Sequence, residues 1–138
     1  MRFVLLLALA LAACAEAAPE SQLAGEWTPI STNSCTTEGR VVTFRPERIY
    51  YRAGRAEDWI AQVTGFTESP GMVDLKVRPR GQTPGGREEL GQEATLRFVV
   101  RDGEARVMGE SYGGPFTPIE DETMTNIFTM KRCDGAGR

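Results

Sequence analysis

The sequence contains no histidine, so it lacks the side chain that most often serves as a catalytic base near neutral pH. Its three cysteines include no C-x-x-C pair, and without histidine the usual zinc-binding patterns are absent. It also has no block of basic residues, and the net charge of its 138 residues is only -3. We therefore predict a protein with no catalytic residues, no metal site, no cofactor and no nucleic-acid partner.

One motif could suggest an enzyme. Residues 109–113 read G-E-S-Y-G and match the G-x-S-x-G pattern of serine hydrolases. That pattern requires a helix after the serine and a histidine base. A loop with glycine and proline follows instead, and the chain has no histidine. We interpret the match as a coincidence and predict that the protein is not an enzyme.

Long apolar runs are absent as well, because the run at residues 3–11 is too short to span a bilayer. Arg2 precedes this run and small residues follow it, as in a secretory signal peptide. The sequence L-A-A-C at residues 11–14 resembles the lipobox of bacterial lipoproteins. This resemblance implies cleavage before Cys14 and attachment of the protein to a membrane through lipid on that cysteine. Ala15 implies, by the same resemblance, the outer membrane of a bacterial cell envelope, with the protein facing the periplasm.

Ordinary secretion is the alternative to a lipid anchor. The sequence A-E-A at residues 15–17 would then be the cleavage site, and the protein would be soluble in the periplasm or secreted. With the lipobox, the chain divides into a signal peptide at 1–13, a lipid-anchored tether at 14–22 and one folded domain at 23–138.

Two cysteines remain when Cys14 carries the lipid, and they are Cys35 and Cys133. An even pair of cysteines in an oxidising compartment favours a disulfide. The alternatives are two free thiols or a metal pair, and a metal pair would lack histidine and C-x-x-C partners. We predict a disulfide between Cys35 and Cys133.

The clearest structural signal is a β-hairpin at residues 93–109. Residues 94–100 alternate between apolar and polar side chains, which is typical of a strand with one face on a core. Asp102 and Gly103 follow and favour a two-residue type I′ turn. Counting outward from the turn predicts the cross-strand pairs Arg101 with Glu104, Val100 with Ala105, Val99 with Arg106, Phe98 with Val107, Arg97 with Met108 and Leu96 with Gly109.

The other apolar and β-rich segments predict further strands at residues 23–28, 40–44, 48–52, 59–64, 73–78 and 123–131. Pro46 lies in one expected turn, and Pro70 and Gly71 suit a type II turn in another. Residues 29–39, 79–92 and 110–121 are expected to be loops. Together these segments predict an all-β fold, a single antiparallel β-barrel of about eight strands in meander order.

The predicted disulfide and the predicted barrel constrain each other. In a strict meander of eight strands, the loop after the first strand and the end of the last strand lie at opposite ends of the barrel. The Cα atoms of a disulfide must lie within roughly 7 Å of each other. Either the loop at 29–39 folds back along the barrel, or the strand count is wrong by one.

The start of the domain resembles a known family. Gly25-Glu26-Trp27 is similar to the Gly-x-Trp that opens lipocalins and related calycin barrels, and Lys131-Arg132 near the end supplies a basic residue. The resemblance implies that Arg132 packs over Trp27 and closes the barrel. The sequence L-A-G-E-W at residues 23–27, followed by a cysteine, also resembles small barrel inhibitors of bacterial metalloproteases.

Two functions are therefore expected. The first is a non-enzymatic envelope lipoprotein whose small barrel binds an apolar ligand or a protein partner. The alternative is a periplasmic inhibitor of a secreted protease or other hydrolase. Tyr112 and Phe116 lie in the loop at 110–121, and aromatic side chains on a loop can anchor an interface. We predict that this loop is a binding loop.

Overall fold

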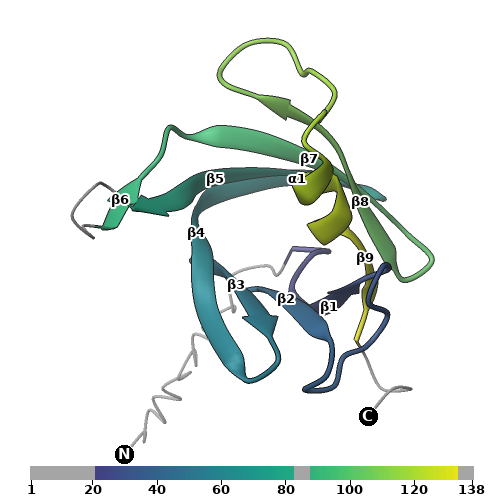
Figure 1. The fold of residues 1–138 in the computed structure, drawn as a ribbon. Helices are drawn as coiled ribbons and strands as arrows, with labels where there is room; N and C mark the ends of the chain where they lie inside the picture. Colours follow the sequence, from purple (N-terminus) through teal and green to yellow (C-terminus); the bar gives the residue numbers. More distant parts are fainter. Residues whose placement is uncertain (1–20, 83–87, 134–138) are drawn as a thin grey trace, which may run out of the picture.

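The computed structural model describes residues 21–82 and 88–133. Cys14, the predicted signal peptide and most of the predicted tether lie outside the described residues. The described chain forms nine strands and one short helix (Figure 1). These elements are β1 (Gly25–Pro29), β2 (Arg40–Phe44), β3 (Arg48–Ala53), β4 (Ala56–Ser69), β5 (Met72–Gln82), β6 (Glu88–Leu90), β7 (Ala94–Arg101), β8 (Glu104–Ser111), α1 (Glu122–Ile127) and β9 (Thr129–Arg132).

Eight of the strands close into an antiparallel barrel. Leaving out β6, each barrel strand pairs with the next barrel strand along the chain, so that β5 pairs with β7. Strand β9 closes the barrel by pairing with β1. The short strand β6 pairs with the outer part of β5 and extends beyond the barrel (Figure 1). The predicted all-β fold, with eight barrel strands in meander order, is confirmed.

The hairpin of β7 and β8 follows the predicted register near its turn. Asp102 and Gly103 both have positive φ, 51° and 75°, as a type I′ turn requires. The four pairs nearest the turn are as predicted, but a β-bulge follows, so that Arg97 lies opposite Gly109 and not Met108. Gly109 suits this place, since an added Cβ would lie 3.0 Å from the Thr117 carbonyl oxygen.

The hairpin of β4 and β5 is longer than the sequence pattern predicts. Ser69 pairs with Met72 across the expected turn, and Gly71 has a φ of 80°. The prediction of a loop at residues 79–92 is wrong in part, because β5 continues to Gln82 and then pairs with β6. The Arg78 side chain of β5 donates to the Gly91 carbonyl oxygen at 3.0 Å and so holds the segment after β6 against β5. The expected loop at 110–121 also begins with the end of β8.

The predicted strand at 123–131 is wrong in its first half. Residues 122–127 form the helix α1, and only Thr129–Arg132 form the strand β9. Asp121 is the reason, since its carboxylate accepts from the backbone N–H groups of Thr123 and Met124 at 2.8 and 3.3 Å. This N-cap satisfies two donors that would otherwise lack partners and so favours a helical turn.

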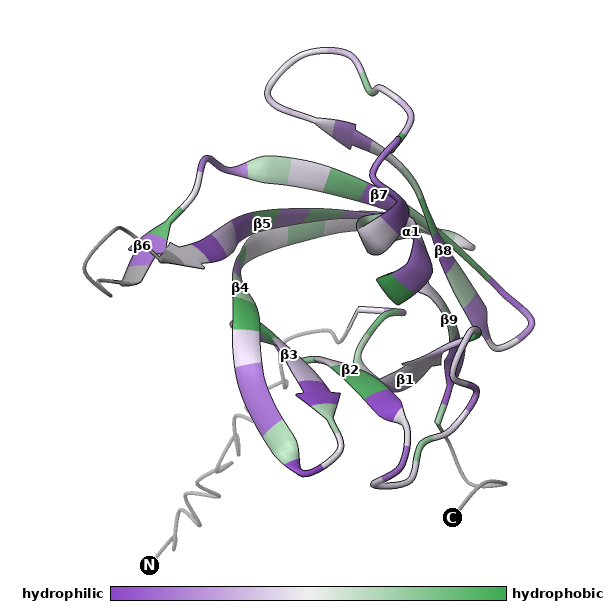
Figure 2. Ribbon diagram, in the orientation of Figure 1, coloured by the Kyte–Doolittle hydropathy of each residue, from purple (hydrophilic) through white to green (hydrophobic). Residues whose placement is uncertain are grey.

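Aromatic rings fill the middle of the barrel. Phe44, Phe98 and Phe128 lie with their ring centroids 5.7 to 6.3 Å apart, and two of the three pairs are edge-to-face. The buried residues around them come from strands on all sides of the barrel. Figure 2 shows apolar and polar residues in alternation along the strands. Because successive side chains of a strand point to opposite faces, the apolar residues lie inside the barrel.

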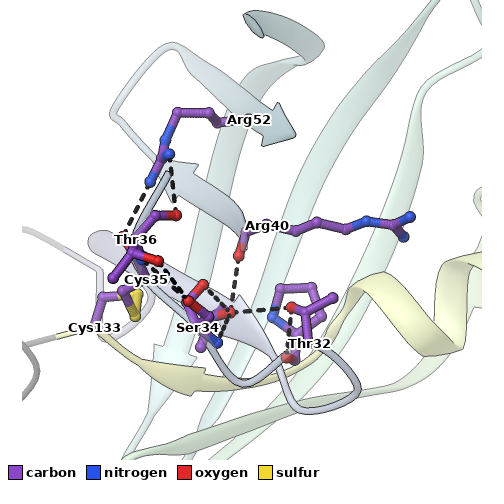
Figure 3. Close-up of a disulfide and its surroundings, with 9 residues drawn as sticks. Thr32, Ser34, Cys35, Thr36, Arg40, Arg52 and Cys133 are labelled. Carbon is purple, nitrogen blue, oxygen red and sulfur yellow. Dashed lines mark hydrogen bonds between the residues drawn. A yellow bond between two sulfur atoms is a disulfide. The ribbon is translucent and has the colours of Figure 1, made fainter. Parts of the chain in front are cut away.

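The disulfide between Cys35 and Cys133 is confirmed, with Cα atoms 5.8 Å apart (Figure 3). Of the two alternatives, the loop after β1 folds back. The buried Thr28 hydroxyl donates to the Arg40 carbonyl oxygen at 2.8 Å and accepts from the Ser34 N–H at 3.2 Å. These bonds hold the loop against β1 and bring Cys35 back beside the end of β9.

Candidate functional site

One set of predicted site residues connects the two ends of the domain. The Arg132 guanidinium lies 4.2 Å from the centre of the Trp27 ring, which is the contact that the resemblance implied. Arg132 also donates to the carbonyl oxygens of Ala24 at 2.9 Å and Gln22 at 2.7 Å. The indole N–H of Trp27 donates to the Leu23 carbonyl oxygen at 2.8 Å. Arg132 and Trp27 together hold the segment before β1 against the last strand.

A gap in the barrel wall lies beside the second half of β4. Strand β3 begins at Arg48, opposite Gln62, so within the described residues it does not extend along the rest of β4. The segment before β1 lies there instead. Gln22 donates from its backbone N–H to the Glu68 carboxylate at 3.0 Å and from its side chain to the Ser69 carbonyl oxygen at 2.7 Å.

The space between this segment, β2 and β4 is a pocket of about 410 Å³, which we call the β4 pocket. Its lining residues are Ser21, Leu23, Ala24, Gly25, Thr43, Phe44, Arg45, Pro46, Val63, Phe66 and Leu75. Most of them are apolar, and Leu23, Phe44 and Leu75 are also core residues. The pocket therefore leads from the surface to the hydrophobic core.

Phe66 is the notable side chain of the β4 pocket. It pairs with Leu75 of β5, and directly opposite residues of neighbouring strands share one face of the sheet. Leu75 is buried in the core, so Phe66 is also on the inner face. Even so, 37% of Phe66 is exposed, because the wall beside it is open. An inward aromatic ring that is accessible to solvent is available to a ligand.

The predicted binding loop is divided between two environments. Tyr112 is 57% exposed, and its hydroxyl lies 3.4 Å from the Glu110 carboxylate. The negative charge of Glu110 raises the pKa of Tyr112 above its ordinary value, and partial burial adds to the effect. Phe116 is half-buried instead, with the Arg97 guanidinium 3.9 Å from its ring centre. Tyr112 alone projects from the loop as an exposed aromatic ring.

Arg97 is held on the outer wall of the barrel. Its guanidinium donates to both carboxylate oxygens of Asp74, at 2.8 and 2.9 Å. This hydrogen-bonded pair raises the pKa of Arg97 further above its ordinary value. Phe116 packs on an arginine whose charge is already paired, so this contact belongs to the fold of the loop.

The β4 pocket was not predicted from the sequence. The predicted strand ended at residue 64, which left Phe66 without an assigned face. A β-bulge between Val63 and Gly65 shifts the alternation and turns Phe66 inward. The apolar residue two positions beyond the predicted end of the strand was the available signal.

Within residues 21–82 and 88–133, no cluster of three or more potential metal-ligating side chains is present. In the same part of the chain, no helix is long and apolar enough to cross a membrane. A comparison with models of known protein families finds no match to this chain. Searches of curated proteins and of solved structures find no match either.

Proposed function

We propose that this protein is a lipoprotein of the bacterial cell envelope that binds an apolar ligand in the β4 pocket and catalyses no reaction. The anchor would be the lipid on Cys14, with the barrel facing the periplasm from the outer membrane. The observation that carries the proposal is the β4 pocket, where an inward-facing but exposed Phe66 meets an apolar lining. Its volume of about 410 Å³ is within the range of small-molecule sites, roughly 300–1,000 Å³.

The filled centre of the barrel supports this position for the ligand. Phe44, Phe98 and Phe128 pack against one another in the core. A ligand in the barrel centre would have to displace them, whereas the β4 pocket already has open space beside Phe66. We therefore expect binding without a large change in the core.

The test uses N-phenyl-1-naphthylamine, a neutral apolar probe that fluoresces more strongly in apolar surroundings. The wild-type protein is expected to bind it saturably with one site per chain. Phe66→Gln removes an apolar wall and is expected to weaken binding about fivefold, the equivalent of about 1 kcal/mol of lost apolar contact. Met108→Gln is the matched control, because Met108 is 55% exposed and does not line the β4 pocket.

Equal binding by Phe66→Gln and Met108→Gln, with circular dichroism showing both variants folded, would contradict the assignment of this pocket. The anchor is tested separately. We expect the wild-type protein to fractionate with membranes and Cys14→Ala to become soluble. Unchanged membrane association of Cys14→Ala would contradict lipid anchoring.

Recognition of a protein partner is the second candidate function, and the exposed ring of Tyr112 favours it. Inhibition of a periplasmic or secreted hydrolase is one form of it. Tyr112→Ala is expected to weaken such a complex while leaving probe binding in the β4 pocket unchanged. The measurement is inhibition of a panel of proteases and lysozymes by wild type and variant, and no inhibition by the wild type would contradict the inhibitor form.

A further inference from the structure

A second hollow of about 510 Å³ adjoins the β4 pocket at the turn between β2 and β3. We call it the arginine hollow, and its lining residues are Arg45, Pro46, Glu47, Arg48 and Tyr50. Arg45 and Pro46 also line the β4 pocket, so the two spaces share a border. One side of this border is mainly apolar, and the other side carries two arginines.

The two arginines of the hollow are held by aromatic rings. The Arg45 guanidinium lies 4.8 Å from the centre of the Tyr50 ring, and that of Arg48 lies 4.5 Å from the centre of the Trp59 ring. Stacking of this kind orders the guanidinium plane and leaves its N–H groups able to bind an anion.

Neither Arg45 nor Arg48 forms an ion pair with a carboxylate in the part of the chain that the structure describes. Arg80 differs, although it stacks on the same Trp59 ring, because it pairs with Asp58 at 2.8 Å. Both Arg45 and Arg48 are exposed.

The charge of the arginine hollow is positive. Glu47 is the one carboxylate among its lining residues, against two arginines. An anionic group at this place would meet guanidinium donors, which bind carboxylate and phosphate oxygens with two parallel hydrogen bonds. An alkyl chain attached to that group could pass the shared border at Pro46 and enter the β4 pocket.

We propose that the ligand is a single-chain amphiphile with an anionic headgroup. Its alkyl chain would lie in the β4 pocket against Phe66, and its carboxylate or phosphate would bind Arg45 and Arg48. This inference depends on the proposed function, since it assumes that the β4 pocket binds an apolar group. One chain is expected, because the mainly apolar space is about 410 Å³ and the adjoining hollow is polar.

The test compares three ligands with the same alkyl chain at pH 8, the two anions below their micelle concentrations and the neutral alcohol below its solubility. Dodecanoate carries a carboxylate, dodecyl phosphate carries a phosphate, and 1-dodecanol is neutral. Each ligand competes with N-phenyl-1-naphthylamine for the full-length protein purified as the Cys14→Ala variant. Both anions are expected to bind about two to five times more tightly than 1-dodecanol, the contribution of an exposed ion pair. Tighter binding of one anion would identify which headgroup the arginine hollow prefers.

Two variants act on the headgroup alone. Arg48→Gln is expected to reduce the preference for the anions and to leave 1-dodecanol binding unchanged, because Arg48 lines the arginine hollow and not the β4 pocket. Glu47→Gln removes the carboxylate of the arginine hollow and is expected to strengthen binding of both anions. Arg101→Gln is the matched control, because Arg101 is exposed at the β7–β8 turn and lines neither space.

The possible failures are distinct. If 1-dodecanol binds as tightly as both anions, or if Arg48→Gln keeps the full preference, this inference is overturned and the apolar site stands. If the probe binds but no alkyl ligand displaces it, this inference is also overturned. If the probe itself does not bind, the proposed function fails as well.

Discussion

Replacement of Arg132 gives the sharpest test of how the barrel ends are joined. Arg132 donates to the carbonyl oxygens of Gln22 and Ala24 and stacks on Trp27. A hydrogen bond from a charged donor contributes about 1.5–3 kcal/mol, and we take the lower value because Arg132 is only half-buried. At this value the two hydrogen bonds contribute about 3 kcal/mol together. The stack on Trp27 adds about 0.5 kcal/mol, so Arg132→Ala is expected to lower the free energy of unfolding by about 3.5 kcal/mol.

Urea denaturation followed by circular dichroism measures this loss. With a denaturant slope of about 1.5 kcal/mol per molar urea, the midpoint should fall by about 2 M. Arg132→Lys keeps the charge but loses the planar guanidinium that reaches both carbonyl oxygens. Its urea midpoint is therefore expected to lie between those of the wild type and Arg132→Ala. Lys131→Ala is the matched control, since Lys131 is the exposed neighbour on the same strand. If Arg132→Ala loses no more stability than Lys131→Ala, Arg132 does not join the barrel ends as we infer.

Three further predictions concern other parts of the molecule. Replacing Cys35 and Cys133 by serine removes a disulfide that spans 98 residues of sequence and should lower the free energy of unfolding by up to about 4–5 kcal/mol. An unchanged urea midpoint would contradict this prediction. Gly39→Ala should destabilise the protein by about 2 kcal/mol or more in the same assay, because an added Cβ would overlap the Ser34 carbonyl group. Glu110→Gln should lower the pKa of Tyr112 toward its ordinary value, since the Glu110 charge disfavours the phenolate; absorbance at 295 nm during a pH titration measures this shift, and an unchanged curve would refute the cause.

Local patterns were sufficient to predict most of the barrel. The Asp102 and Gly103 turn fixes the register of its hairpin for four pairs, because turn chemistry and strand alternation act over a few residues. The disulfide also followed from an even pair of cysteines in a chain whose first residues predict export. These features depend on neighbouring residues or on residue counts, and both are visible in a sequence.

The incorrect predictions involve contacts between distant segments or competing local signals. The capping carboxylate of Asp121 overrode the strand-like pattern that follows it. Strand β6 depends on its pairing with the outer part of β5, which a Gly- and Pro-rich sequence does not reveal. The β4 pocket depends on a bulge before Phe66 and on the segment around Leu23 crossing the gap. No single stretch of sequence contains all of these contacts.

The folded-back loop has a consequence for the order of oxidative folding. Cys35 and Cys133 meet beside the seam between β1 and β9, so their thiols approach each other when the last strand docks on the first. A chain that crosses a membrane N-terminus first would carry Cys35 without its disulfide partner until Cys133 has followed. The rate at which free thiols disappear in an oxidising buffer, measured by alkylation at successive times, would therefore report the closing of the barrel itself.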